Sequence, residues 1–168
     1  NAFPSGRILC FDDKFVYGYG RVTVAAGPVG HRADAYHLFC QGREPGPSQA
    51  AVGRKGKKET MSSEPGPTLW SEEPSLIVRA MVLGADRLAV AGAVDRSVKD
   101  PDLLAFQNDA EARASFAGQR GVVLRVVSAE NGKRLSETEL NAMPVLDGLS
   151  AAGGCLYISL QDGTVLCV

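Results

Sequence analysis

Short apolar runs separated by turn-forming residues dominate both ends of the chain. Such runs, bounded by Gly, Asp and Asn, are typical of β-strands joined by tight turns. They predict three antiparallel sheets. The expected strands are 8–11, 15–19, 36–40 and 68–71 in the first sheet, 78–83, 87–92, 121–127 and 134–138 in the second, and 147–152, 155–160 and 164–168 in the third.

The clearest predicted hairpin lies at the carboxyl end, around Asp162-Gly163. An Asp-Gly pair suits a two-residue type I′ turn, because both central positions need a positive φ. This turn predicts that Leu160 faces Val165. The apolar face of the hairpin would then consist of Leu156, Ile158, Leu160, Val165 and Cys167. Cys155 falls on the other face, so parity argues against a Cys155–Cys167 disulfide.

A second hairpin is predicted around Asn131-Gly132, which also favours a two-residue turn. The same pairing arithmetic places four apolar side chains on a common face: Val122, Leu124, Val126 and Leu135.

An internal repeat emerges when three segments are compared. Each has a strand, a tight turn and a second strand of large apolar residues: 8–18, 81–91 and 149–159. Aligning Phe15, Leu88 and Leu156 gives spacings of 73 and 68 residues. These exceed the ~40–45 residues of a four-stranded propeller blade. Long insertions at 41–67 and 93–120 account for the excess.

The repeat predicts an all-β fold of about three four-stranded antiparallel meander blades of the β-propeller type. Together they form a single partial propeller unit over 1–168, with approximate blades 5–71, 72–140 and 141–168. Known propellers close with about 4–8 blades. The remaining blades are therefore expected from upstream residues of the same protein or from a second copy.

One short helix is predicted inside the insertion 93–120. Asp100 suits the N-cap, Pro101 suits the first helical position, and Gly118 suits the end of the helix.

Several motifs resemble the PQQ-like repeat of quinoprotein-type β-propellers, in which a G-x-L-Y-x-x-x-x-D-G hairpin recurs once per blade. The matching residues are Gly132-Lys133, Asp147-Gly148-Leu149, Gly153-Gly154-Cys155-Leu156-Tyr157 and Asp162-Gly163. Trp70 is similar to the repeat's frequent Trp. The resemblance covers 120–168 most closely and 68–92 and 5–40 more loosely. It implies the C-terminal part of a larger repeat protein, in an extracytoplasmic (periplasmic or secreted) location in a bacterium.

The same resemblance implies two functions. The family includes quinone-dependent dehydrogenases and also propellers that bind no cofactor and act as scaffolds. This sequence lacks a vicinal Cys-Cys pair and has a single Trp. We therefore expect a non-catalytic scaffold or interaction module without a cofactor, presenting the insertions to a protein partner. The alternative is the terminal part of a PQQ-dependent or related oxidoreductase, with PQQ and calcium bound by residues outside this segment.

The histidines are the first candidates for chemistry. His31 and His37, with Asp34 between them, could ligate a metal or join Ser48 in a Ser–His–Asp group. No third ligand or nucleophile elbow accompanies them, so we interpret them as ordinary loop and strand-edge residues.

Charged residues give no stronger signal. The net charge of −1 offers no general attraction to nucleic acid. The basic cluster 54–58 lies in a Pro/Gly-rich loop and is interpreted as a solvated tip. Asp12-Asp13, Asp86 and Asp162 recur at equivalent turns, which indicates turn formers rather than catalytic acids.

The cysteines, the lack of a long apolar run and the amino terminus complete the picture. Cys10, Cys40, Cys155 and Cys167 lack metal-site spacing and lie in strand-like runs, which predicts small structural side chains. No apolar run approaches the ~20 residues of a membrane-spanning helix, so no membrane insertion is expected. The chain begins Asn1-Ala2 without Met, which we interpret as a processed protein or a cloned fragment.

Overall fold

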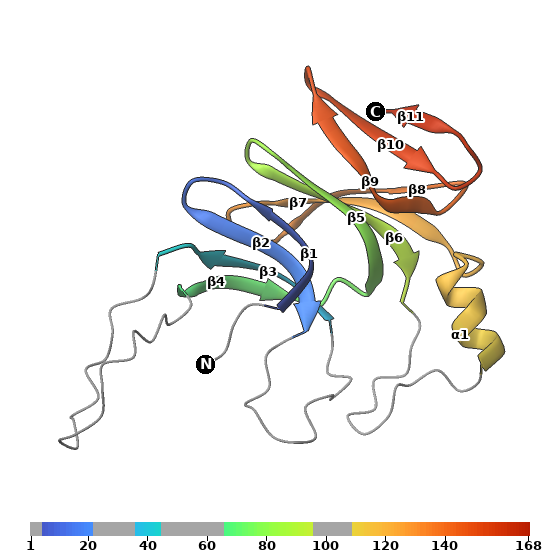
Figure 1. The fold of residues 1–168 in the computed structure, drawn as a ribbon, viewed down its shortest axis with the longest axis horizontal. Helices are drawn as coiled ribbons and strands as arrows, with labels where there is room; N and C mark the ends of the chain where they lie inside the picture. The colour runs from blue at the N-terminus through green and yellow to red at the C-terminus, as the bar shows by residue number, and fades with distance from the viewer. Residues whose placement is uncertain (1–4, 22–35, 45–65, 96–108) are drawn as a thin grey trace, which may run out of the picture.

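In the part of the chain that the computed structural model describes, three antiparallel sheets and one short helix form the fold (Figure 1). The structure describes residues 5–21, 36–44, 66–95 and 109–168. Each sheet is a meander, in which strands pair in the order of the sequence. The predicted all-β fold class, with meander sheets of four, four and three strands, is confirmed.

The strand bounds follow the hydrophobic pattern closely. The first sheet contains β1 (Ser5–Phe11), β2 (Phe15–Arg21), β3 (Tyr36–Gly42) and β4 (Thr68–Glu72). The second contains β5 (Leu76–Gly84), β6 (Arg87–Val94), β7 (Val122–Ser128) and β8 (Arg134–Glu139). The third contains β9 (Pro144–Ala152), β10 (Cys155–Leu160) and β11 (Val165–Cys167). Every predicted strand is present, and only the ends differ.

The sheets stack face to face in chain order. Figure 1 shows the second sheet between the first and the third. The first strands of the three sheets lie beside one another, with β5 contacting both β1 and β9. Each sheet therefore has a backward face, directed toward the preceding sheet, and a forward face, directed toward the next.

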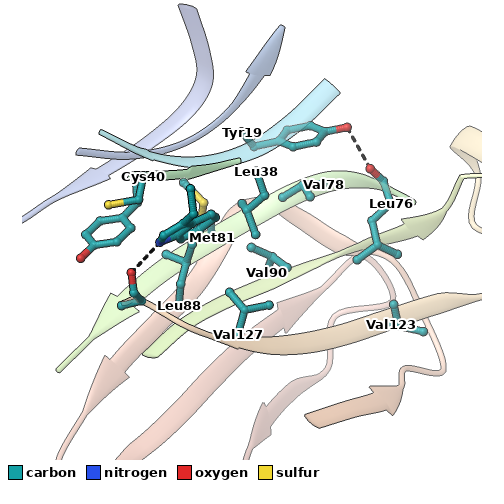
Figure 2. Close-up of a cluster of buried hydrophobic side chains, with 13 residues drawn as sticks. Tyr19, Leu38, Cys40, Leu76, Val78, Met81, Leu88, Val90, Val123 and Val127 are labelled. Carbon is teal, nitrogen blue, oxygen red and sulfur yellow. Dashed lines mark hydrogen bonds between the residues drawn. The ribbon is translucent and has the colours of Figure 1, made fainter. Parts of the chain in front are cut away.

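Aromatic residues fill the interface between the first and second sheets (Figure 2). Tyr17, Tyr19 and Trp70 from the first sheet pack on aliphatic side chains of the second: Leu76, Val78, Met81, Leu88, Val90 and Val127. The Tyr19 hydroxyl donates a hydrogen bond to the Leu76 carbonyl at 2.9 Å. Burial of such large rings supplies most of the stabilisation, and this polar contact fixes the registration of the sheets.

Small residues allow the second and third sheets to approach closely. Ala80, Ala89 and Ala91 of the second sheet are buried against Ile158 and Leu160 of the third. Alanines opposite bulky side chains interdigitate without leaving voids, as close packing requires. The sheets thus pack face to face in both interfaces, with aromatic rings in the first interface and alanines against larger aliphatic side chains in the second.

The register predicted for the C-terminal hairpin is wrong by one residue. Val165 lies opposite Ser159 rather than Leu160, and Cys167 lies opposite Tyr157. The loop has three residues instead of two, because the Leu160 N–H donates to the Thr164 carbonyl, and within it only Gly163 has a positive φ (+89°). The shift moves Val165 and Cys167 off the predicted apolar face, leaving Leu156, Ile158 and Leu160 there.

The β7–β8 hairpin shows a similar correction. Val122, Leu124 and Val126 share a face as predicted, but Leu135 is 54% exposed and lies outside this cluster. The Ser128 N–H donates to the Lys133 carbonyl, which gives a four-residue loop, and a register shift follows at β8. The loop length preserves the predicted parity, and the extra residue Leu135, between the pairs Val127–Arg134 and Val126–Ser136, reverses it.

The repeat alignment also needs one adjustment. Leu88 and Leu156 occupy equivalent backward-facing positions in β6 and β10, whereas Phe15 faces forward into the first interface. The residue equivalent to Leu88 is Val16, the second residue of β2. The reason is the β1–β2 connection (12–14), which is one residue longer than its counterparts at 85–86 and 153–154.

The helix α1 (Asp109–Phe116) lies within the predicted insertion. Gly118 ends it with a φ of +75°, and the N–H groups of Gly118 and Gln119 bond the carbonyls of Ser115 and Ala114. This Schellman arrangement confirms the predicted stop. The predicted cap at 100–101 lies outside the described residues. No helix in the described ranges is long and apolar enough to cross a membrane.

Candidate interaction surface

Most of the residues predicted as chemical candidates lie outside the described part of the chain. His31, Asp34, Ser48 and the basic cluster 54–58 belong to this group. His37 is described: it lies in β3, with its ring nitrogen Nδ1 at 3.1 Å from the Ser71 hydroxyl. Within the described ranges, no three His, Cys, Asp or Glu side chains come together as a metal site would require.

The acidic residues at the turns have structural roles. The Asp12 carboxylate accepts hydrogen bonds from the N–H groups of Lys14 and Phe15, both at 2.7 Å. Burial raises the pKa of Asp12, but these backbone bonds outweigh it and hold that pKa below its ordinary value. Asp162 accepts similarly from the Thr164 N–H at 2.9 Å. Asp86 forms only an exposed ion pair with Arg87 at 3.6 Å.

Tyr17 and Cys40 form a buried pair on the forward face of the first sheet. They lie directly opposite each other on β2 and β3, and are only 4% and 1% exposed. Burial raises the pKa of the Cys40 thiol to about 11, although a hydrogen bond with Tyr17 opposes the shift. Burial also raises the pKa of the Tyr17 hydroxyl. Both groups are therefore neutral at physiological pH, as core side chains are.

Tyr157 and Cys167 form the same pair on the forward face of the third sheet. They lie directly opposite each other on β10 and β11, but Tyr157 is 38% exposed and Cys167 is exposed. The neighbouring Cys167 thiol raises the pKa of Tyr157. A hydrogen bond with Cys155 raises the pKa of Cys167 in turn. Cys155 thus shares this face with Cys167, contrary to the predicted parity, and all four cysteines are free thiols.

A second accessible face lies at the opposite end of the stack. The backward face of the first sheet presents apolar side chains that no described sheet covers: Leu9, Phe11, Val16, Phe39 and Leu69. Phe11 is 69% exposed, and Leu9 and Leu69 are each 48% exposed. The Phe39 ring lies over Gly18 so closely that a Cβ at this position would collide with it. The stack therefore ends in an apolar surface.

The hydrophobic pattern alone does not reveal these two faces. It correctly groups the strands into sheets, but the hairpin registers decide which side chains point outward. The sequence feature that could have revealed the forward face is the equivalence of Tyr17 and Tyr157. This equivalence appears only when Val16, Leu88 and Leu156, the second residues of their strands, are aligned.

Comparison with known proteins adds no assignment: no family model, curated protein or solved structure matches this chain.

Proposed function

We propose that this chain is a run of propeller-type blades that acts as a non-catalytic scaffold or interaction module. It would be the C-terminal part of a larger protein built from PQQ-like repeats. The observation that carries the proposal is the pair of accessible sheet faces at the two ends of one continuous stack. Exposed apolar side chains grouped on one face, such as Leu9, Phe11 and Leu69 on the first sheet, are typical of surfaces that bind another protein element.

The interior of the stack supports the same proposal. Three side chains of the first sheet, Tyr19, Trp70 and Cys10, donate to backbone carbonyls of the second sheet or of its β7–β8 loop. These hydrogen bonds hold adjacent sheets together. The side chains in the interface between the first two sheets that have raised pKa values, such as Cys40, owe the shift chiefly to burial rather than to an arrangement of catalytic groups.

The adjacency of β1, β5 and β9 also agrees with a propeller. In a propeller, blades are four-stranded sheets arranged around a central axis, and they leave only short, protected edges. Three stacked meanders with neighbouring first strands would form one arc of such a ring. Such a scaffold works by rigidity, because its sheets hold loops and faces in fixed relative positions.

Titration of the intact protein, including any repeats outside this segment, with PQQ and Ca²⁺ tests the proposal, because the oxidoreductase alternative places both ligands on residues outside this segment. We expect no heat of binding in calorimetry and no change in the quinone absorbance. Saturable binding of PQQ that depends on Ca²⁺ would contradict the scaffold and favour the oxidoreductase alternative. Free PQQ mixed with an unrelated all-β protein provides the baseline.

A further inference from the structure

The three sheets repeat one arrangement of side chains on their forward faces. The third residue of the second strand lies opposite a residue of the third strand in each sheet. These pairs are Tyr17–Cys40, Ala89–Val126 and Tyr157–Cys167. The first pair is covered by the second sheet, and the second pair is covered by the third sheet. The third pair has no described sheet in front of it.

The Tyr–Cys pair of the third sheet therefore has the composition of a contact face. At the equivalent place in the first sheet, Tyr17 packs against Trp70, and the centroids of the two rings are 6.3 Å apart. Both rings lie in the hydrophobic core between the first and second sheets. Tyr157 carries the same ring in the same register but remains 38% exposed. An antiparallel sheet with aliphatic and aromatic side chains would fit over it.

The backward faces repeat in the same way. On the second sheet this face carries Met81, Leu83 and Leu88, which pack on the first sheet. The equivalent residues of the first sheet are Leu9, Phe11 and Val16, as the cross-strand pairs show. Met81 is 2% exposed, whereas Leu9 is 48% exposed. The first sheet thus presents the surface that a preceding forward face would cover.

We propose that the forward face of the third sheet packs on the backward face of the first sheet of a second copy of this chain. This inference rests on the proposed scaffold function and names its partner: the covering sheet comes from a second copy of this chain, which takes the place of a preceding blade of the same chain. The two faces lie at opposite ends of one stack, with the second sheet between them (Figure 1). They therefore meet a partner rather than each other.

A two-fold axis satisfies both faces at once. Each copy contributes one forward and one backward face, so a dimer buries two equivalent interfaces and leaves neither end exposed. The dimer contains six sheets, which lies within the range of about 4–8 blades in closed propellers. The packing of one copy on the other would then repeat the packing of the first sheet on the second and of the second sheet on the third.

Sedimentation of the full 168-residue chain over a concentration series tests the dimer. We expect twice the chain mass for the unmodified protein. Phe11→Asp and Tyr157→Asp each place a carboxylate at a buried interface, so each should weaken dimerisation roughly a hundredfold or more. Leu135→Asp is the matched control, because Leu135 is 54% exposed on β8 and lies at neither end face. It should leave the dimer intact.

Mixing the two variants identifies the pairing. A Phe11→Asp copy retains its forward face and a Tyr157→Asp copy retains its backward face. The mixture should recover a heterodimer held by one intact interface, weaker than the unmodified dimer and stronger than either variant alone. If a face paired with itself, one variant alone would dimerise normally and mixing would recover nothing.

Several outcomes would overturn the proposal: a monomer at every concentration, a dimer insensitive to both variants, or an open series of higher oligomers. Circular dichroism checks that the variants fold, and Phe11→Ser and Tyr157→Ser replace any aspartate variant that does not. A monomeric chain, together with an intact protein that binds no PQQ, would refute the dimer and leave the scaffold proposal intact. PQQ binding would refute the scaffold whatever the mass.

Discussion

The indole Nε1 of Trp70 donates a hydrogen bond of 2.9 Å to the backbone carbonyl of Ala129. Trp70 belongs to β4 of the first sheet, and Ala129 begins the β7–β8 loop of the second. Both residues are buried, at 8% and 4% exposure. The single tryptophan of the chain therefore joins the outer parts of two sheets, while Tyr19 joins them near β5. Two polar contacts at separate points fix both the position and the angle of the sheets.

Substitution of Trp70 should destabilise the stack in two steps. Trp70→Phe keeps an aromatic ring, though a smaller one, and leaves the buried Ala129 carbonyl without its donor, at a cost of at least about 1–3 kcal/mol. Trp70→Ala also removes the packing, for a total of about 3–5 kcal/mol. Urea unfolding followed by circular dichroism measures both. Leu135→Ala, at an exposed position, should stay within about 0.5 kcal/mol, and an equally small effect of Trp70→Phe would contradict the role of the hydrogen bond.

Gly132 should resist substitution for two separable reasons. Its φ is +73°, and a Cβ there would lie 2.7 Å from Cε3 of Trp70. The backbone conformation alone costs a non-glycine residue about 1–3 kcal/mol, and the contact with Trp70 adds to this in Gly132→Ala. Gly153→Ala is the control, because Gly153 has a φ of +60° but no atom within 4 Å of a Cβ.

A double-mutant cycle separates strain from contact. In a Trp70→Ala background, the cost of Gly132→Ala should fall toward that of Gly153→Ala, since the ring is gone and only the flexible Glu72 side chain, with Cγ at 3.2 Å, remains near the Cβ. Chemical denaturation of the four proteins gives the coupling energy. Strict additivity of the two substitutions would show that the indole does not press on this turn.

The hydrophobic pattern is sufficient to predict the strands and insufficient for two registers. Apolar runs bounded by turn residues locate every strand, because a buried strand needs a continuous or alternating apolar pattern. The Asp-Gly and Asn-Gly pairs predict two-residue loops. Both pairs also suit longer loops, in which Asp162 or Asn131 accepts a bond from an N–H two residues on and only the glycine has a positive φ. The dipeptide does not distinguish these loops.

The accessible faces cannot be predicted for the same reason. A change of one residue in a loop reverses the parity of the following strand. A two-residue loop would place Cys167 on the face opposite Cys155 and Tyr157, although it lies opposite Tyr157 in the structure. The sequence alignment matches Phe15 with Leu88 because the sequence does not show that the β1–β2 connection is one residue longer than the β5–β6 connection. The predicted repeat therefore matches the strands correctly, but it displaces Phe15 by one residue and so assigns it to the wrong face of its sheet.

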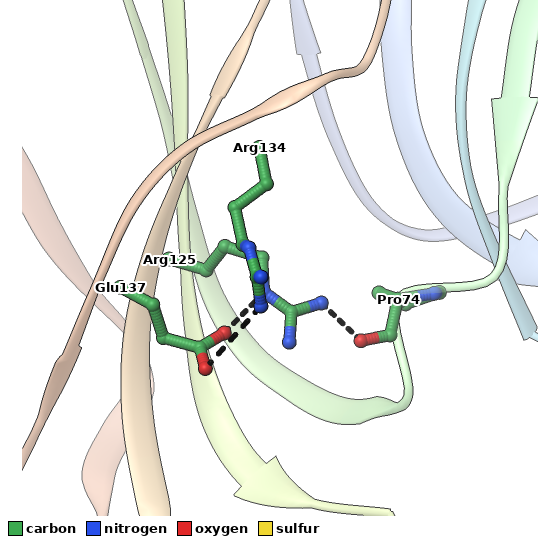
Figure 3. Close-up of polar contacts among 4 residues, drawn as sticks. All are labelled: Pro74, Arg125, Arg134 and Glu137. Atoms are coloured by element: carbon green, nitrogen blue, oxygen red, sulfur yellow. Dashed lines mark hydrogen bonds and ion pairs between the residues drawn. The ribbon is translucent and has the colours of Figure 1, made fainter.

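Arg125 should contribute to stability through its position between the sheets (Figure 3). Its Nε donates to the Glu137 carboxylate at 2.6 Å, and its Nη1 donates to the Pro74 carbonyl in the connection from β4 to β5. The Arg125 side chain is only 16% exposed. Arg125→Met would leave both acceptors without this donor, and we expect a loss of about 1–3 kcal/mol.

Arg134 provides the matched control for that substitution. It also pairs with Glu137, but at 3.7 Å and with 62% of its side chain exposed. Exposed ion pairs contribute little, so Arg134→Met should change the free energy of unfolding by no more than about 0.5 kcal/mol. Thermal and urea unfolding measure the two variants side by side. An equally small effect of Arg125→Met would show that the buried contacts of Arg125 with Glu137 and Pro74 do not stabilise the fold.

The buried thiol of Cys40 predicts a loss of stability at alkaline pH. Burial raises its pKa in the folded protein to about 11, above the ordinary value of 9.0. The folded state therefore keeps the proton that the unfolded state releases, so this contribution is complete below pH 9.0 and is lost as the pH rises toward 11. The urea midpoint of the unmodified chain should fall over this window. Cys40→Ala should flatten the fall, while Leu135→Ala, at an exposed position without a titratable group, should retain it; an unchanged profile in Cys40→Ala would assign the alkaline loss to other groups, such as Tyr17.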